Sequence, residues 1–201
     1  EGYFKQRIDE DGIQTETYPR FDPYPLLKKL PVKFTLHLRD RDVWIQVYQF
    51  DYVGHDGHII PLYFLDTDVE ENFYDDRNIT LRLYSGDKDH RILQEAILGF
   101  GGTKLLDELG QNDIKTFHMN EGHCSFLVLN LLEKYDGDVE KVRSQCHFTT
   151  HTPVAAGHDH FSEYRVKKLL HGLYPENLEL PSLVQNGRLH MTELGLYFSR
   201  S

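Results

Sequence analysis

Apolar and polar residues alternate over the first part of the chain, which is the pattern of β-strands with one buried face. The alternation is clearest over residues 32–38 and 43–53, where β-branched and aromatic residues recur between polar ones. Polar residues 40–42 between these stretches predict a hairpin turn. An apolar stretch at residues 59–65 predicts a third strand, and residues 1–60 are expected to form a β-rich segment.

Helical spacing of apolar residues replaces the alternation further along the chain. Residues 89–109 keep this spacing, although Gly99, Gly101 and Gly102 interrupt it. A glycine inside a helix costs about 1 kcal/mol relative to alanine. The three glycines are therefore expected to allow close packing or a kink in this helix.

Strands and helices then alternate to the end of the chain. The predicted elements are a strand over residues 114–119, helices over 121–135 and 139–145, a strand over 146–150, a helix over 163–171 and a helix from residue 191. The first four form a βαβ-like unit. A β-rich part followed by alternating elements favours an α/β sheet with an antiparallel extension. Residues 61–201 are expected to form the sheet-and-helix segment of the same domain as residues 1–60.

Charge and composition disfavour several classes of partner and location. The chain has 22 basic and 32 acidic residues, and its net charge of −10 disfavours nucleic acid and anionic membranes as partners. No apolar run approaches the ~20 residues that span a bilayer, and no secretory signal pattern opens the chain. Cys124 and Cys146 are too few for a disulfide framework, which predicts a reducing, cytoplasmic location. Cys124 opens an apolar helical run, so packing is favoured over a nucleophilic role for its thiol.

Two polar segments that follow predicted strands carry most of the candidate chemistry. Residues 117–123 read FHMNEGH, and residues 147–153 read HFTTHTP. In an open α/β sheet, ligands bind beyond the carboxyl ends of the strands, where both segments fall. The two segments together predict one shared pocket for a polar ligand.

Helix capping and metal binding are the alternatives to this interpretation. Asn120 could cap the helix predicted to follow it, and Glu121 would suit the positive end of the helix dipole. Zinc ligands could come from Glu121 and the histidines at positions 147, 151, 158 and 160. No H-E-x-x-H or other compact zinc signature is present, so no metal site is expected. The glycine-rich nucleotide motifs and the nucleophile elbow are absent from the sequence as well.

The sequence resembles the α-glucan (glycogen and maltodextrin) phosphorylases, in particular their shorter bacterial and archaeal branch. The two most specific motifs are HMNEGH at residues 118–123 and FTTHTPVAAGHDHF at residues 148–161. Further segments agree with the family in order and rough spacing, namely residues 2–9, 12–14, 61–68, 83–87, 91–95 and 191–196. Any one of these segments would be weak evidence, whereas the ordered set is specific to the family.

The resemblance implies a fold, a reaction and a cofactor. The fold would be part of the amino-terminal Rossmann-like domain of a GT-B glycosyltransferase, with the chain as an internal fragment that begins at Glu1 rather than at Met. The reaction would convert α-1,4-glucan and orthophosphate to glucose 1-phosphate and a shortened glucan, with retention. Pyridoxal 5'-phosphate would be bound by a carboxy-terminal cofactor domain that this chain lacks, so the fragment alone is expected to be inactive. A homo-oligomer of the full-length protein stays open.

The resemblance also implies roles for particular residues. His151 is the expected catalytic residue, because the family's corresponding imidazole meets the glucosyl unit at the cleavage point. The expected substrate-binding residues are Asn120, Glu121, His123, Thr150 and Thr152, with Asp87 in a loop (residues 84–87) that resembles the family's active-site gate.

Two other functions remain open at this point. A sugar-nucleotide-dependent GT-B glucan synthase would share the architecture and a similar T-x-H pattern without the cofactor. A non-catalytic carbohydrate-binding module is favoured by the lack of any lysine in a cofactor-binding motif.

Overall fold

A long antiparallel sheet forms the first part of the structure, a computed structural model that describes residues 4–18, 22–83, 86–175 and 183–201. The sheet consists of β3 (Lys28–Leu38), β4 (Arg41–Val53) and β5 (Ile59–Asp66) in that order. The predicted alternation is confirmed, because every second residue around the β3–β4 turn is buried, including Leu36, Leu38 and Val43. The sheet continues to the end of β5, so the β-rich part extends past residue 60.

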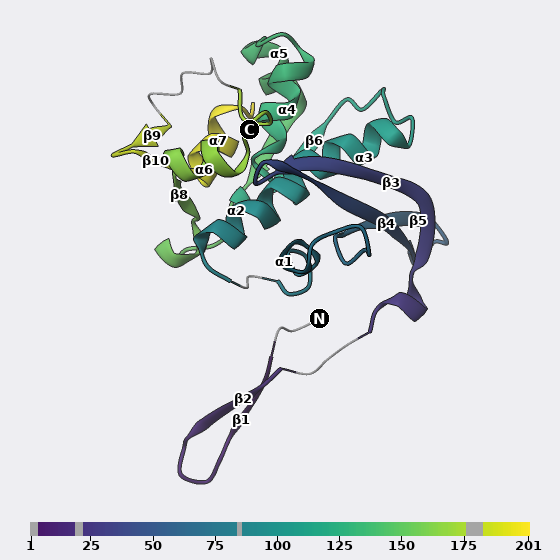
Figure 1. Cartoon of the computed structure of the whole chain (residues 1–201), viewed down its shortest axis with the longest axis vertical. Helices are drawn as coiled ribbons and strands as arrows, with labels where there is room; N and C mark the ends of the chain where they lie inside the picture. Colours follow the sequence, from purple (N-terminus) through teal and green to yellow (C-terminus); the bar gives the residue numbers. More distant parts are fainter. Residues whose placement is uncertain (1–3, 19–21, 84–85, 176–182) are drawn as a thin grey trace.

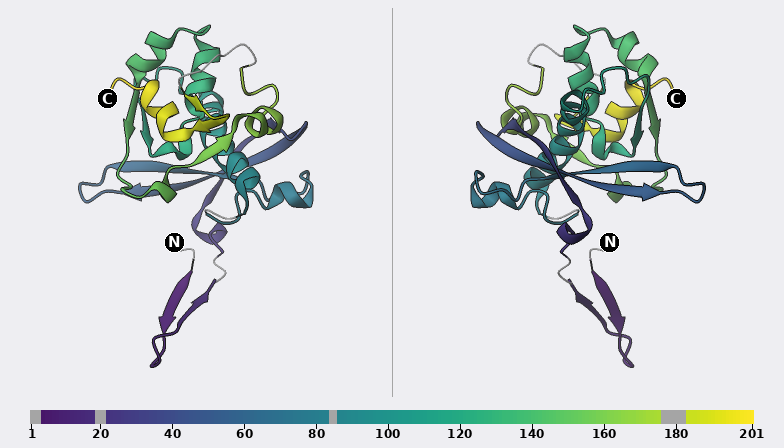
Figure 2. Two further views of the ribbon diagram at one scale, coloured as in Figure 1. Left: turned by 90° about the vertical axis from the view of Figure 1, so that its left-hand side faces the viewer. Right: turned by 90° about the vertical axis from the view of Figure 1, so that its right-hand side faces the viewer.

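A separate hairpin precedes this sheet. It pairs β1 (Lys5–Ile8) with β2 (Gln14–Thr17), and all of its residues are exposed. Figures 1 and 2 show it projecting away from the body of the molecule. A short 3-10 helix, η1 (Tyr24–Leu26), comes before β3.

The helix predicted over residues 89–109 is three segments in the structure. They are α2 (Lys88–Ala96), the π-helix η2 (Ile97–Gly101) and α3 (Gly102–Glu108); a single turn, α1 (Tyr74–Arg77), comes earlier. The close packing expected of the glycines is confirmed at Gly99, where an added Cβ would lie 2.7 Å from the backbone N of Leu127. The extra residue per turn of the π-helix falls where Phe100 stacks on Phe126, with 5.8 Å between the ring centroids.

The predicted βαβ-like unit is confirmed, with shorter helices. Its elements are β6 (Phe117–Asn120), the 3-10 turn η3 (Gly122–Cys124), α4 (Leu127–Lys134), α5 (Val139–Gln145) and β7 (Cys146–Thr149). β6 and β7 are parallel, with Asn120 opposite Thr149, so the polar segments after the two strands lie side by side. The capping role considered for Asn120 is wrong, since Asn120 ends β6 and neither η3 nor α4 has a side-chain cap.

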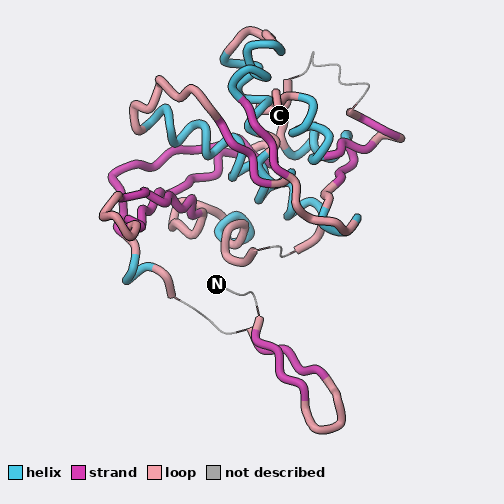
Figure 3. Tube along the Cα trace, turned by 180° about the vertical axis from the view of Figure 1, so that it is seen from behind, coloured by secondary structure: helices cyan, strands magenta, loops and turns pink. Residues whose placement is uncertain are grey.

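A fourth sheet, ordered β8-β10-β9, lies on the side of the helices away from β3–β5. Its strands are β8 (His160–Ser162), β9 (Val184–Gln185) and β10 (Arg188–His190). The helices in this part of the chain are η4 (Ala155–Gly157), α6 (Glu163–Leu169) and α7 (Met191–Tyr197). Figure 3 shows the long β3–β5 strands on one side of the helices and the short β8–β10 strands on the other. The fold is therefore mixed α/β, as predicted. None of the helices in the described ranges has the length and apolar character needed to cross a membrane.

Candidate functional site

The buried carboxylate of Glu121 lies where the carboxyl ends of β6 and β7 meet. Glu121 is 4% exposed and has a backbone φ of 66°, which turns its side chain toward the loop after β7. Its Oε1 accepts hydrogen bonds from the backbone N–H groups of His151 (2.7 Å) and Thr152 (2.8 Å). Its Oε2 accepts a hydrogen bond from Thr150 Oγ1 at 3.1 Å. One carboxylate therefore holds three consecutive residues of the loop.

These hydrogen bonds decide the charge of Glu121. Burial by itself raises the pKa of a carboxyl group, because it penalises the charged form. At Glu121 the donors from His151, Thr152 and Thr150 outweigh burial and lower the pKa from 4.5 to about 2. Glu121 is therefore a carboxylate throughout the neutral range.

The imidazole of His151 stands at the surface beside this carboxylate. Its side chain is 63% exposed, and its Nδ1 lies 3.4 Å from Glu121 Oε1. Its Nε2 lies 3.2 Å from Asn120 Oδ1. Asn120 and Thr150 are exposed next to it, so an imidazole, an amide and a hydroxyl face solvent together. Such a set can exchange hydrogen bonds with the hydroxyl groups of a sugar.

The far end of the loop is fixed through His158. His158 Nε2 lies 2.9 Å from the carbonyl oxygen of Thr152, and His158 Nδ1 lies 2.9 Å from Thr192 Oγ1 in α7. Gly157 packs tightly against Thr152, since an added Cβ would lie 2.2 Å from Thr152 Cγ2. The loop that carries His151 is thus held at both ends.

His123 lies in a different environment from the other expected residues. Its Nδ1 lies 3.3 Å from Arg91 Nη2, 3.6 Å from Asp159 Oδ2 and 3.8 Å from Glu95 Oε1. Arg91 Nη2 also donates to Glu95 Oε1 and to Asp159 Oδ2, at 2.8 Å in each case. We call Arg91, Glu95, His123 and Asp159 the Arg91 cluster. It joins α2, η3 and the segment before β8.

Mutual charge and burial set the protonation states in the Arg91 cluster. The Asp159 and Glu95 carboxylates raise the pKa of His123 to about 9. Burial raises the pKa of Glu95, which is 1% exposed, to about 8. Burial acts in the same direction on Asp159, but hydrogen bonds with His123, Glu95 and Arg91 outweigh it and hold the pKa of Asp159 below its usual range.

Three residues of the Arg91 cluster are close enough to bind one metal ion, but the positive charge of Arg91 disfavours a cation there. Glu95, His123 and Asp159 offer ligand atoms within 4.8 Å of one another, and across the described ranges they are the one such group. The Arg91 guanidinium already bonds both carboxylates, and a second cation there would be repelled. The histidines at positions 147, 151, 158 and 160 do not join Glu121 in any such group.

Asp87 caps α2 four residues before Arg91, and its backbone oxygen accepts a hydrogen bond from the Arg91 N–H at 3.0 Å. Its side chain accepts a hydrogen bond from the backbone N–H of His90 at 2.9 Å, which is an ordinary helix cap. Tyr84 and Ser85, the first half of the expected gate loop, lie outside the described residues.

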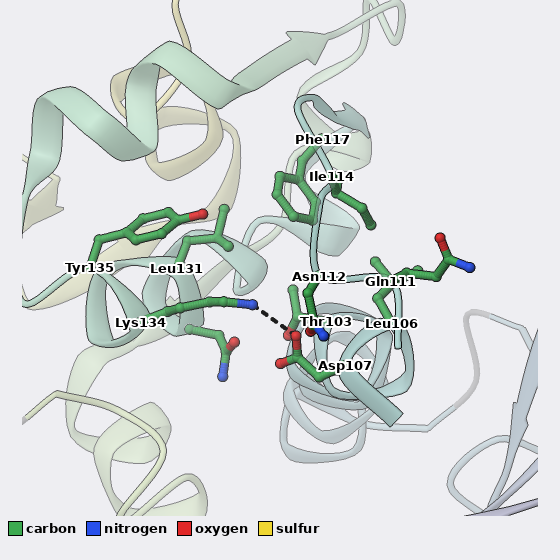
Figure 4. A pocket seen from close by; sticks show the side chains of 11 residues that line it. Thr103, Leu106, Asp107, Gln111, Asn112, Ile114, Phe117, Leu131, Lys134 and Tyr135 are labelled. Atoms are coloured by element: carbon green, nitrogen blue, oxygen red, sulfur yellow. Dashed lines mark hydrogen bonds and ion pairs between the residues drawn. The ribbon is translucent and has the colours of Figure 1, made fainter. Parts of the chain in front are cut away.

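A hollow elsewhere in the molecule is too small to compete as the site. It lies between α3, the segment before β6, and α4, with the Lys134–Asp107 ion pair at 2.8 Å beside it (Figure 4). Its volume of about 10 Å³ is that of one water molecule. It contains no residue of the His151 loop.

Comparison of the sequence with known proteins shows which of them this chain is similar to. No family model matches the chain. The maltodextrin phosphorylase of Thermococcus litoralis is 40% identical over 190 residues, covering 86% of this chain and 22% of that protein. The glycogen phosphorylase of Mycobacterium tuberculosis is 39% identical over 181 residues, covering 80% of this chain and 20% of that protein. The glycogen phosphorylase of Aquifex aeolicus is 40% identical over 172 residues, covering 77% of this chain and 23% of that protein.

The chain is a relative of the α-glucan phosphorylases. It spans between 20% and 23% of the length of these three phosphorylases, so it corresponds to a small part of each. The resemblance drawn from the two motifs is thereby confirmed.

The phosphorylase resemblance pointed to the His151 loop but missed most of the Arg91 cluster. Asn120, Glu121, Thr150, His151 and Thr152 come together in the structure, as expected, whereas His123 turns away into the cluster. A signal for the cluster was present in the sequence. Arg91 and Glu95 are four residues apart on a predicted helix, which places them on one face and allows an ion pair.

Proposed function

We propose that this chain is part of an α-1,4-glucan phosphorylase and supplies the glucan side of its active site. The reaction would be phosphorolysis of an α-1,4-glucan by orthophosphate, giving glucose 1-phosphate and a shortened chain with retention. The observation that carries the proposal is the exposed His151, held by Glu121 and Asn120 at the carboxyl ends of two parallel strands. That edge of a parallel sheet is where α/β enzymes bind their ligands.

We infer that the chain folds as part of the amino-terminal Rossmann-like domain of a GT-B enzyme. The parallel β6–β7 pair with its connecting helices supports this inference. Residues 1–60 and 61–201 would be two segments of that one domain, and they share a core in which Ile45 of β4 contacts the region of Gly101 in η2. The other wall of the active site would come from the rest of the protein.

In this proposal the chain's own residues bind and orient the sugar. His151 would hydrogen-bond the glucosyl unit at the cleavage point, and Asn120 and Thr150 would bind neighbouring hydroxyl groups. Glu121 and Thr152 complete the site that we propose, with Asp87 at its gate, whereas His123 belongs to the Arg91 cluster. Holding the reacting sugar in one orientation lowers the entropic part of the barrier.

Pyridoxal 5'-phosphate is the cofactor that we propose for the full-length protein. Its phosphate group would act beside the substrate phosphate as a proton donor and acceptor. The described residues do not fit a binding site for it, because a Schiff-base lysine needs a buried position and every described lysine is exposed or half-buried. We therefore assign cofactor binding to a carboxy-terminal half beyond this chain.

The proposed partners are α-1,4-glucan and orthophosphate, with neither nucleic acid nor membrane. The acidic balance of the chain supports this choice. A cytoplasmic location is supported by Cys124 and Cys146, which form no disulfide. We also propose that the full-length protein forms a homo-oligomer, which a measurement of its mass in solution would test.

The test is to purify the full-length protein that contains this chain and measure two properties. Cofactor absorbance and fluorescence report bound pyridoxal phosphate, and a coupled assay with maltodextrin and orthophosphate reports glucose 1-phosphate. We expect both signals, and we expect neither from residues 1–201 alone. Glucan synthesis from a sugar nucleotide without the cofactor would favour a glucan synthase. Glucan binding with neither activity nor cofactor would favour a binding module.

A further inference from the structure

The carboxylate of Glu121 is already occupied by the chain itself. Its Oε1 accepts two backbone N–H groups and its Oε2 accepts one hydroxyl, while His151 Nδ1 lies 3.4 Å from Oε1. The side chain is 5% exposed. An ionised carboxylate has about four acceptor positions, and these contacts use most of them. Little capacity is left for a sugar hydroxyl.

The backbone at Glu121 is held in a conformation that suits this contact. A φ of 66° is uncommon for a residue other than glycine, and it is retained when surrounding contacts determine it. Glu121 N donates to Thr149 O at 2.8 Å, which continues the β6–β7 pairing by one residue. The next residue, Gly122, packs so closely on the start of α7 that an added Cβ would lie 3.1 Å from Met191. The turn therefore aims the Glu121 side chain into the loop rather than toward solvent.

We propose that Glu121 is a positioning residue for His151 and not itself a glucan ligand. This proposal rests on the proposed function. It adds a division of roles, in which His151 contacts the sugar and Glu121 holds His151 in place. Asn120, Thr150 and His151 present their side chains to solvent, whereas Glu121 beneath them is buried. Glu121 fixes the backbone of His151 and Thr152, and that backbone sets where the exposed imidazole stands.

Charge is part of this role. A carboxylate that accepts backbone N–H groups forms stronger hydrogen bonds than a neutral acceptor does. Removing it leaves the N–H groups of His151 and Thr152 without their acceptor at a part-buried position. The loop would then find other partners, and His151 would lose its fixed position against the sugar.

The test is a double-mutant cycle on phosphorolysis by the full-length protein, with Glu121→Ala, His151→Ala and the double variant. Glu121→Ala should lower kcat by about 10- to 100-fold, the size expected for lost hydrogen bonds to a charged group. If Glu121 acts through His151, the same change in the His151→Ala background should cost less than about threefold. Equal losses in both backgrounds, or a raised KM for glucan at unchanged kcat, would overturn the proposal and make Glu121 a direct ligand.

Glu121→Gln keeps the proposal testable if the alanine variant does not fold. The amide oxygen can still accept both backbone N–H groups, and the amide nitrogen can donate to the Thr150 hydroxyl, so only the charge is lost. We expect about a 3- to 10-fold loss of kcat, again absent in the His151→Ala background. The matched control is Glu133→Gln on the exposed face of α4, which should leave kcat unchanged.

A second readout separates this proposal from the proposed function. With ¹⁵N-histidine labelling, the His151 amide resonance should move more in Glu121→Gln than any other histidine amide, and Glu133→Gln should leave it in place. This shift does not depend on catalysis. A wild-type protein without phosphorylase activity would contradict the proposed function, whereas an unmoved His151 amide would contradict the positioning role.

Discussion

The His151 loop and the Arg91 cluster each bury a glutamate, and the two glutamates behave in opposite ways. Glu121 is 4% exposed and has a pKa of about 2, whereas Glu95 is 1% exposed and has a pKa of about 8. Both oxygens of Glu121 accept hydrogen bonds from the loop. Glu95 Oε1 accepts from Arg91, but its Oε2 has no hydrogen-bond partner within the described residues. Burial keeps Glu95 protonated at neutral pH, whereas at Glu121 the three donors outweigh burial and keep the carboxyl group charged.

The histidines of the two regions differ in solvent exposure and in their neighbours. His151 is 63% exposed and is available to a ligand, while the His123 side chain is 24% exposed and lies among two carboxylates and a guanidinium. Only Gly122 separates Glu121 from His123 along the chain. One short turn therefore serves the proposed sugar site on one side and a structural charge cluster on the other.

The largest effect is expected from Arg91→Met, which should destabilise the protein by about 3–5 kcal/mol. The change removes the charged donor that Glu95 and Asp159 share, and each hydrogen bond to a charged group contributes about 1.5–3 kcal/mol. Denaturant unfolding of the full-length protein, followed by fluorescence, measures the loss.

The matched control for Arg91 is Arg143→Met in α5. Arg143 pairs with Glu140 at 3.5 Å, and that pair is solvent-exposed, so the change should cost no more than about 1 kcal/mol. Equal losses in the two variants would mean that the Arg91 cluster contributes no more than a surface ion pair.

The pH dependence of stability should separate the two regions at opposite ends of the scale. The pKa of His123 is raised from 6.5 to about 9, so its stabilisation is complete below pH 6.5 and is lost as pH rises through 9. The pKa of Glu121 is lowered from 4.5 to about 2, so its stabilisation is present above pH 4.5 and is lost as pH falls toward 2. Each contribution should be on the order of 1–3 kcal/mol.

Thermal unfolding as a function of pH measures both effects. His123→Gln should flatten the alkaline part of the profile and leave the acid part, while Glu121→Gln should do the reverse. A single variant that flattens both parts of the profile would show that the His151 loop and the Arg91 cluster titrate as one unit.

The smallest effect is expected from Thr150→Val, which removes one of the three donors to Glu121. The Thr150 hydroxyl lies 3.1 Å from Oε2, and both backbone donors to Oε1 remain. We expect a loss of about 1 kcal/mol in transition-state stabilisation, or roughly fivefold in kcat. Thr15→Val in the exposed β2 strand is the control and should leave kcat unchanged. A loss as large as that of Glu121→Ala would contradict the view that the two backbone donors to Oε1 are enough to hold the loop.

The sequence predicted the longer strands, the main helices and the meeting of the two motifs, because each depends on local periodicity and on parallel strands ending at one edge. It did not predict the β1–β2 hairpin as a separate unit, the short strands β8, β9 and β10, or the π-helix at residues 97–101. It also missed the direction of His123. Glu121, with a φ of 66°, bonds the loop after β7, while His123 two positions later lies against Asp159, and no side-chain pattern reports such a backbone angle.

The Arg91 cluster was hard to predict for a different reason. It joins residues 32 and 68 positions apart, and their meeting depends on how α2 packs against η3 and the segment before β8. The residue spacing within one segment does not predict contacts between segments that are distant in sequence.

The most direct test of the central claim is the steady-state kinetics of phosphorolysis by the His151→Ala variant of the full-length protein. His151 would act where the glucosyl ring flattens and charge develops, so its loss should affect the transition state more than the bound glucan. We expect kcat to fall about 10- to 100-fold with KM for maltodextrin nearly unchanged, and with bound cofactor equal to wild type. An unchanged kcat, with or without a raised KM, would contradict the account and leave His151 as an ordinary surface histidine or a simple binding contact.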